Sequence, residues 1–380
     1  MKLDGQETAR LPSLTGMRWA AAFLVFGFHI HVERVYADGP AADVVRFLFA
    51  PGPVGVSFFF ILSGFVLAWS ARPADSSRAF WRRRAAKLLP NHLVTWAVVL
   101  VAFIAFGTEF TVAEAGSNAV LLQGWVPDQS VYFGMNTPSW SLSSEAFFYL
   151  LFPALWFLLK GAGTRVLALG AGMMIGAIWA LPAVALLLPD HIAYWFVWIF
   201  PVSRLPEFVL GICAARLVAV GSWPRVSAWA AGLAFVAAYL AAPSLGRWGF
   251  VAVTSVPLVF LIAATARRDV VGAPSFWRAA PLVTLGNWSF AFYLVHQIVI
   301  RFAASSGHSP LVGTVWALAL LAAALAAAAT LHKLVEVPGM KRFSKRRPTA
   351  RPPGQGFVPS LPASLEAAQP KVSSVPGSGA

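Results

Sequence analysis

An arginine and a histidine lie eleven residues apart in the first long apolar run, MRWAAAFLVFGFHIHV. In a helix, Arg18 and His29 fall on one face, about 16 Å apart along the axis. Ionisable side chains inside a membrane span are costly and therefore mark candidate functional sites. A guanidinium binds phosphate, and an imidazole accepts a proton near neutral pH. The pair therefore suggests an anion anchor at one end of a path and a general base at the other.

Both residues also have an ordinary structural explanation. Arg18 opens the apolar run and could be an interface anchor whose charged end reaches the membrane surface. His29 could be a hydrogen-bonded histidine of the core, which is the commoner role for a lone histidine. His31 points about 200° away from His29 around the helix, so we interpret it as structural.

A carboxylate is predicted at a similar depth in the stretch NTPSWSLSSEAFFYLLFP, residues 136–153. Ser139 or Ser141 can cap a helix here, which places Glu145 about one turn into the span. An acid near a helix N-terminus is favoured by the helix dipole alone. Alternatively, Glu145 contacts His29 and fixes its tautomer, as a general base requires.

A basic stretch, WRRRAAKLLPNH at 81–92, enters a later apolar run. Arg84 and Lys87 are three residues apart and share a helix face. The stretch is a topology signal, and it would also suit the phosphates of a nucleotide or of coenzyme A. In another run, FPVSRLPEFVLG, Arg204 and Glu207 are interpreted as a structural buried ion pair, with the helix broken at its two prolines.

Other reactive groups give weaker signals. In GNWSFAFYLVHQ, Tyr293 and His296 lie three residues apart on one helix face. Cys213 has no neighbouring base and, as a single cysteine, excludes an internal disulfide, an iron–sulfur cluster and a cysteine-rich zinc site. No metal site is predicted. Serine nucleophiles remain open at Ser141, Ser143 and Ser144.

These residues must be held by membrane-spanning helices. The 380 residues are 58% hydrophobic and only 12% charged, about half the charge of a soluble domain. We predict an all-α polytopic membrane protein. About ten windows are long enough to cross the roughly 30 Å of hydrocarbon, at 17–35, 54–71, 88–107, 140–160, 165–188, 194–220, 226–243, 247–266, 282–303 and 309–333.

The basic residues predict the orientation of these spans. With both termini cytoplasmic, most of the 29 Lys and Arg residues fall inside. Those outside are Arg34, Arg46, Arg247 and Arg301. Because the bases cluster at the ends of apolar runs, the charge of +14 indicates a plasma-membrane protein and not a nucleic-acid partner.

We expect three parts: a cytoplasmic segment at 1–16, a transmembrane domain at 17–337, and a disordered basic, Pro-rich cytoplasmic tail at 338–380. The loop at 108–139 is the longest outer connection. Its apolar centre, 117–125, is too short to cross and is a candidate re-entrant segment.

Taken together, these stretches resemble the acyltransferase-3 family of bacterial integral membrane O-acyltransferases. The stretches that carry the resemblance are RLPSLTGMRWAAAFLVFGFH, GVSFFFILSGFVL, the basic run before Pro90, PSWSLSSEAFFYLLFP, RLPEFVLG, SFAFYLVH and VEVP. The family's Arg-x10-His motif falls on Arg18 and His29. Its paired arginines fall on Arg84 and Lys87, so one arginine is replaced by lysine.

The serine-rich motif of the family falls on Trp140 to Glu145, with Ala146 where a polar residue usually follows, and its late histidine falls on His296. The resemblance implies His29 as general base with Glu145 orienting it. Arg18, Arg84 and Lys87 would hold the donor. Residues expected to support the substrate are Trp140, Ser141, Ser143, Arg204, Tyr293 and His296.

The resemblance implies transfer of an acyl group, commonly acetyl, from cytoplasmic acyl-CoA to a hydroxyl, with no permanently bound cofactor. Acceptors include cell-envelope carbohydrates and lipophilic natural products, and the form LPSLTGMRWAAAFLVF resembles the branch that acylates macrolides. We expect no fused esterase-like domain. Ser63 and Gly64 could let the acyl arm pass between helices. The alternatives are a transporter or flippase, and a non-catalytic partner in a larger synthase.

Overall fold

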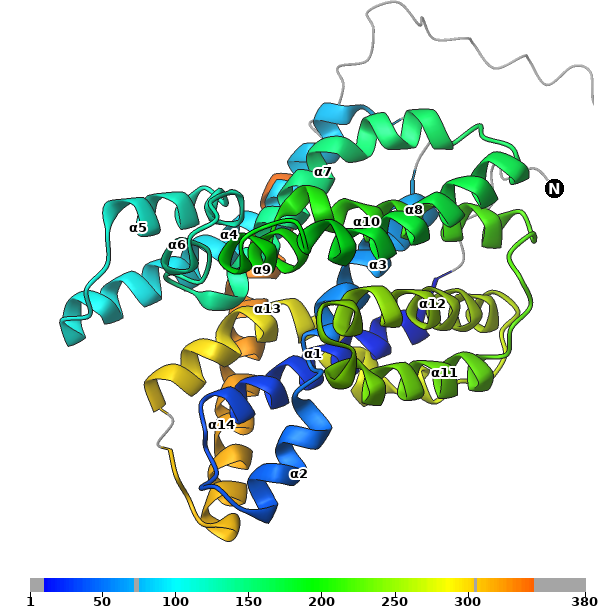
Figure 1. Ribbon diagram of the computed structural model, residues 1–380. Helices are drawn as coiled ribbons and strands as arrows, with labels where there is room; N and C mark the ends of the chain where they lie inside the picture. Colours follow the sequence, from blue (N-terminus) through cyan, green and yellow to red (C-terminus); the bar gives the residue numbers. More distant parts are fainter. Residues whose placement is uncertain (1–9, 72–74, 304–305, 345–380) are drawn as a thin grey trace, which may run out of the picture. The chain divides into compact units, whose positions relative to one another are not determined.

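The computed structural model describes residues 10–71, 75–303 and 306–344, and its regular elements are helices joined by loops (Figure 1). In those ranges the β pairing is limited to an isolated bridge between Tyr36 and His308. Each of the ten predicted windows overlaps one long helix, and the window 194–220 also reaches into the shorter helix before it. The long helices are α1 (Pro12–Val32), α3 (Val54–Trp69), α4 (Ser77–Phe106), α7 (Trp140–Leu159), α8 (Thr164–Ala185), α10 (Pro201–Ala219), α11 (Ala228–Ala241), α12 (Thr254–Val270), α13 (Ala280–Ala303) and α14 (Pro310–Leu331).

Shorter helical elements connect the long ones. They are α2 (Pro40–Phe49), α5 (Val112–Ala119), α6 (Gln129–Tyr132), α9 (Asp190–Trp198) and α15 (Val337–Ser344), together with 3₁₀ or π turns at Gln123–Trp125, Thr137–Ser139, Ala242–Trp248, Gly249–Val253, Phe276–Arg278 and His332–Glu336.

Eight helical segments of the described chain are long and apolar enough to cross a membrane. One of them, Ala228–Val270, contains both α11 and α12. Helix α1, which carries Arg18 and His29, is not among the eight. The predicted all-α polytopic membrane fold is confirmed.

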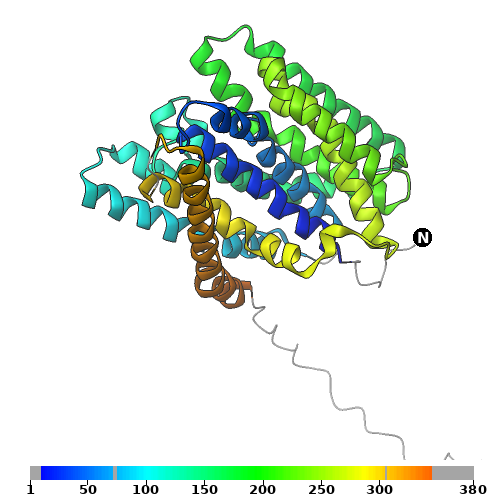
Figure 2. The same ribbon diagram turned by 90° about the horizontal axis from the view of Figure 1, so that it is seen from below.

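Helix α1 lies between α3 and α13, and α14 packs against α13 and shares a hydrophobic cluster with α1 (Figures 1 and 2). Helix α3 also packs closely along α10. A Cβ atom at Gly64 would lie 1.9 Å from the carbonyl oxygen of Phe208, and one at Gly211 would lie 2.0 Å from that of Ile61. Gly64 therefore serves the α3–α10 contact, whereas Ser63, the other residue expected to let the acyl arm pass, lines the cavity described below.

Two predicted helix boundaries need correction. Helix α4 extends beyond its apolar window at 88–107 and begins at Ser77, because the Ser76 hydroxyl caps it by accepting a hydrogen bond from the Ala79 amide at 3.2 Å. Pro206 lies inside α10 and does not break it. The break lies before Pro201, at the first position of α10, where a missing amide proton costs nothing.

The predicted tail boundary at 338 is also wrong, because α15 continues to Ser344 and packs against α4. A Cβ atom at Gly339 would lie 3.0 Å from the Pro90 ring. The remainder of the predicted tail, 345–380, and residues 1–9 of the predicted N-terminal segment lie outside the described residues.

The long loop before α7 folds against the start of that helix. The Asn118 side-chain amide donates to the Ser139 hydroxyl at 2.9 Å, and that of Gln123 donates to the Ser139 carbonyl at 2.9 Å. A ring nitrogen of His92, on α4, is 2.8 Å from the Asn118 carbonyl. These contacts bind the apolar segment 117–125 to both α4 and α7.

Candidate active site

A cavity of about 130 Å³ lies among α1, α3, α4, α7 and α13. Its charged lining consists of three cations and one carboxylate: Arg18, Arg84, Lys87 and Glu145. The structure therefore brings together the three predicted donor-binding residues, which come from two different helices. Ser63, Ser141 and Tyr293 line the same cavity.

The protein supplies too few carboxylates to neutralise the three cations of this cavity. The side chains of Arg18 and Lys87 make no hydrogen bond or ion pair with another described residue. The guanidinium of Arg84 lies over the rings of Phe80 and Tyr149, 5.4 and 5.9 Å from their centres, and its Nε is buried without a hydrogen-bond partner. Buried charges are costly unless they are paired. An anionic ligand would supply the missing partner.

Two carboxylates attract these cations from a distance. Glu145 lines the cavity and accepts a hydrogen bond from the Tyr149 hydroxyl one turn along α7. Glu336 is buried behind it and close enough for its charge to act on Arg18 and Lys87. Sequence reasoning missed Glu336 as a functional residue. The available signal was an acid in VEVP, directly after the last apolar run.

Glu336 is held by neighbours on two sides. One of its oxygens accepts a hydrogen bond from the Asn91 side-chain amide at 3.1 Å and lies 3.1 Å from Nδ1 of His332. These contacts fix the carboxylate beside α4, the helix that carries Lys87.

The hydrogen bonds around His29 determine its tautomer. Nδ1 of His296 lies 3.2 Å from the Phe292 carbonyl, which can only accept, so this nitrogen carries the proton. The other nitrogen of His296, Nε2, is then an acceptor and lies 3.1 Å from Nδ1 of His29. Nδ1 of His29 also lies 2.9 Å from the Val25 carbonyl and must be its donor. Nε2 of His29 therefore carries a free lone pair.

The predicted contact between Glu145 and His29 is wrong. His29 takes its partner from α13, because α1 packs against α13 at this level. Glu145 instead faces the cavity and the hydroxyl of Tyr149. The similar depth of Glu145 and His29 could be inferred from the sequence. The sequence did not show whether their two helices face each other.

Tyr293 lies between the cavity and the histidine pair. Its hydroxyl is 2.9 Å from that of Ser141 and donates to the Pro138 carbonyl at 3.0 Å. Its ring centre is 5.9 Å from that of His296. His29 does not line the cavity, whereas Tyr293 does. Tyr293 thus connects the cavity that holds the cations to the histidine pair.

The sequence model of the acyltransferase-3 family, described as an acyltransferase domain, matches residues 11–333. This chain is a membrane acyltransferase of that family.

Its relatives differ in length. Acyltransferase MdmB of Streptomyces mycarofaciens is 39% identical over 374 residues, covering 90% of this chain and 95% of the relative. Peptidoglycan O-acetyltransferase OatA of Listeria monocytogenes is 26% identical over 329 residues, covering 76% of this chain and 49% of OatA. The acyltransferase thus spans about half of OatA. No solved structure matches it.

The remaining predicted support residues of the acyltransferase lie outside the cavity. Trp140 packs edge-on against Phe60, with ring centres 6.4 Å apart, and the Ser143 hydroxyl accepts a hydrogen bond from the Gly124 amide at 3.3 Å. Arg204 is buried and pairs with Glu207 at 2.9 Å. These contacts position α7 and α10 and leave the cavity to other residues.

Proposed function

We propose that this acyltransferase moves a short acyl group, such as acetyl, from acyl-CoA to a hydroxyl of a lipophilic natural product such as a macrolide. The observation that carries the proposal is the cavity in which Arg18, Arg84 and Lys87 meet without sufficient anionic partners. Thioester donors of this type carry phosphates on a long, narrow arm. Charge-assisted hydrogen bonds from these cations would hold that arm inside the helix bundle.

The proposal of a natural-product acceptor rests on the resemblance of LPSLTGMRWAAAFLVF to the branch that acylates macrolides. The identity to the peptidoglycan O-acetyltransferase, 26%, is lower than the 39% to the Streptomyces acyltransferase, and this supports an acceptor other than peptidoglycan. A cell-envelope carbohydrate is the second acceptor class to test.

His29 is the proposed general base. Its Nε2 takes the proton from the acceptor hydroxyl as the oxygen attacks the thioester carbonyl. The carbon–sulfur bond then breaks, and the proton passes to the departing thiolate of CoA. His296 keeps the proton of His29 on Nδ1, so that Nε2 is available.

The thioester must come close to Tyr293 to meet the acceptor near His29, because Tyr293 lines the cavity and packs against His296. The hydroxyls of Ser141 and Tyr293 lie at this wall. Both hydroxyls donate to the Pro138 carbonyl, each at 3.0 Å. One of them would have to turn away from Pro138 to donate to the thioester oxygen as it gains negative charge in the transition state.

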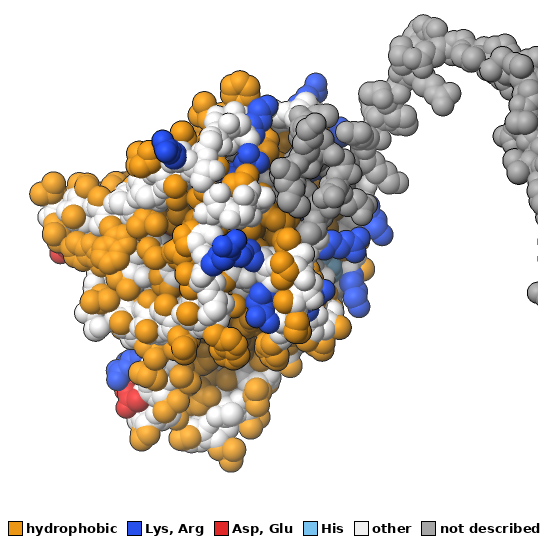
Figure 3. All heavy atoms as spheres, turned by 90° about the vertical axis from the view of Figure 1, so that its right-hand side faces the viewer, with side chains coloured by type: hydrophobic (Ala, Val, Ile, Leu, Met, Phe, Trp, Pro, Cys, Tyr) orange, Lys and Arg blue, Asp and Glu red, His pale blue; other side chains and the backbone are white. Residues whose placement is uncertain are grey.

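The chain is proposed to lie in the plasma membrane with both ends in the cytoplasm. The face shown in Figure 3 supports this orientation, because basic side chains gather there and acidic ones appear only near its edge. Acyl-CoA would then enter the cavity from the cytoplasmic side.

Transfer of a radiolabelled acetyl group tests the proposal. The protein in liposomes, given labelled acetyl-CoA and a macrolide with a free hydroxyl, should release CoA and a labelled ester. A transporter would release neither. His29→Gln should abolish transfer, whereas His31→Gln should retain it. Near wild-type turnover in His29→Gln, with the protein folded, would exclude His29 as the base.

A further inference from the structure

A second cavity, of about 500 Å³, continues from the first towards the end of the bundle that is predicted to be cytoplasmic. Leu67 and Arg84 line both cavities. Helices α3, α4 and α7 each supply one stretch to the first cavity and the adjoining stretch to the second. The two cavities therefore lie end to end along the same three helices.

Together, the two cavities extend along most of helix α7. Helix α7 contributes Ser141 to the first cavity and the residue after its last turn, Lys160, to the second. These two residues are separated by about 28 Å along the helix axis. A ligand that reached both would be long and narrow.

The second cavity is cationic and aromatic. Its basic lining residues are Arg83, Arg84 and Lys160, and its one acidic lining residue is Asp75. The aromatic side chains are held in place by neighbours. The Trp81 indole donates to the Tyr149 carbonyl at 3.0 Å, and Trp156 stacks on Phe152 with ring centres 6.1 Å apart.

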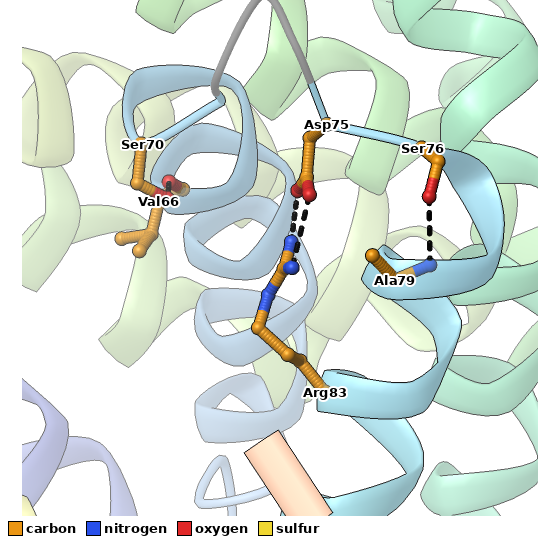
Figure 4. A network of polar contacts seen from close by, with 6 residues as sticks. All are labelled: Val66, Ser70, Asp75, Ser76, Ala79 and Arg83. Atoms are coloured by element: carbon orange, nitrogen blue, oxygen red, sulfur yellow. Dashed lines mark hydrogen bonds and ion pairs between the residues drawn. The ribbon is translucent and has the colours of Figure 1, made fainter. Parts of the chain in front are cut away.

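Asp75, the one acidic residue that lines this cavity, forms an ion pair with Arg83. Both Asp75 oxygens accept hydrogen bonds from the Arg83 guanidinium, one of them at 3.0 Å (Figure 4). Arg83 and Asp75 remain partly open to solvent, at 30% and 17% exposure. The carboxylate thus holds the guanidinium fork in the geometry that a phosphate would take. Lys160 lies over the Phe157 ring at 5.2 Å and pairs with no carboxylate of the described chain.

We propose that this second cavity binds the phosphorylated adenosine end of the acyl-CoA donor. The inference rests on the proposed function and names a second part of the same donor site. The 3′-phosphate contacts Arg83 and Lys160 and displaces Asp75 from Arg83. The diphosphate lies at Arg84, where the two cavities meet, and faces the cations of the first cavity. The adenine ring packs against Trp81 or Trp156, which offer flat faces at low entropic cost. The arm then extends past Arg84 into the first cavity, with its thioester near Tyr293.

Two donors that differ only at this end test the inference. Acyl-CoA carries the phosphorylated adenosine, and acyl-pantetheine lacks it. The wild type should show a kcat/KM for acyl-CoA at least about tenfold above that for acyl-pantetheine, because each charged hydrogen bond is strong. In the double variant Arg83→Gln/Lys160→Gln this ratio should fall by about tenfold or more.

Matched controls lie on the same surface. Arg82 and Arg165 are exposed basic residues that do not line the cavity. The variants Arg82→Gln and Arg165→Gln should keep the wild-type ratio. An equal loss in these controls would show a general effect of surface charge and would overturn the inference, as would a wild-type ratio near one.

Direct binding separates this inference from the proposed function. Adenosine 3′,5′-bisphosphate should bind the purified full-length protein and raise its unfolding temperature, and the double variant should lose this effect. If the wild type binds this probe but transfers no acyl group, the proposed function fails and the nucleotide site stands. If transfer from acyl-CoA occurs and the probe does not bind the wild type, the site is refuted.

Discussion

Whether His29 can accept a proton depends on which of its ring nitrogens already carries one. The Phe292 carbonyl fixes the proton on Nδ1 of His296, and His296 then fixes the proton of His29. Carboxylates commonly play this orienting role in enzymes. A neutral histidine does so here, which avoids a buried negative charge beside the base.

Substitution of His296 should therefore reduce turnover without blocking donor binding. We expect His296→Leu to lower kcat at least about tenfold, with KM for acyl-CoA nearly unchanged, because His29 loses one of the two acceptors of its Nδ1 proton and keeps only the Val25 carbonyl. His296→Gln retains an acceptor oxygen and should keep more activity. Steady-state kinetics with both variants check this, and equal kcat values for Leu and Gln would contradict the orienting role.

Lys87 should act mainly through its charge. We expect Lys87→Gln to raise KM for acyl-CoA by about tenfold, since one charged contact in a buried site is lost. Lys87→Arg keeps the charge and should raise KM less. Donor titrations at saturating acceptor give both values. An unchanged KM in Lys87→Gln would remove this residue from the donor site.

At the scale of helices, α3 and α10 approach so closely that only glycine fits at their contact. Gly211→Val should destabilise the protein by at least about 2 kcal/mol, because the new side chain meets the Ile61 backbone. Gly172, on α8, has open space around it and provides the control Gly172→Val. Thermal unfolding in detergent should show a lower midpoint for Gly211→Val only. Equal midpoints would mean that the helices can move apart.

The Arg204–Glu207 pair should contribute to the fold of α10 as a unit. Arg204 also donates to the Ser57 hydroxyl of α3 at 3.0 Å. Arg204→Leu should cost about 3–5 kcal/mol, because it leaves a buried Glu207 without its partner. The double variant Arg204→Leu/Glu207→Leu should cost less than that. A double-mutant cycle measures the coupling, and simple additivity of the two losses would disprove it.

For the molecule as a whole, the distribution of basic residues predicts which ends of the helices face the cytoplasm. The native Cys213 is fully buried and gives a low labelling background. Glu109 and Ser222 are exposed residues of loops predicted to lie outside and inside. A membrane-impermeant maleimide should label Glu109→Cys but not Ser222→Cys in intact cells. Inverted vesicles should show the opposite pattern, and the reverse result in either preparation would overturn the orientation.

The sequence by itself determined the helices and the chemistry available on them. Apolar windows identified all ten long helices, because helix length and hydrophobicity are local properties. The spacing of Arg18 and His29 on one helix and of Arg84 and Lys87 on another was also predictable, because a helix fixes the positions of its own side chains. Boundaries at Ser77 and Ser344 were less predictable, since caps and packing decide them.

Only the tertiary structure decided which helix faces which. It paired His29 with His296 and turned Glu145 towards Tyr149, although the sequence motifs had suggested a contact between His29 and Glu145. It also revealed Glu336 near the cationic cavity and the cavity that contains Arg83 and Lys160. The physical reason is that helix contacts depend on the shape of whole surfaces, such as the glycine contact between α3 and α10. No single stretch of sequence contains that information.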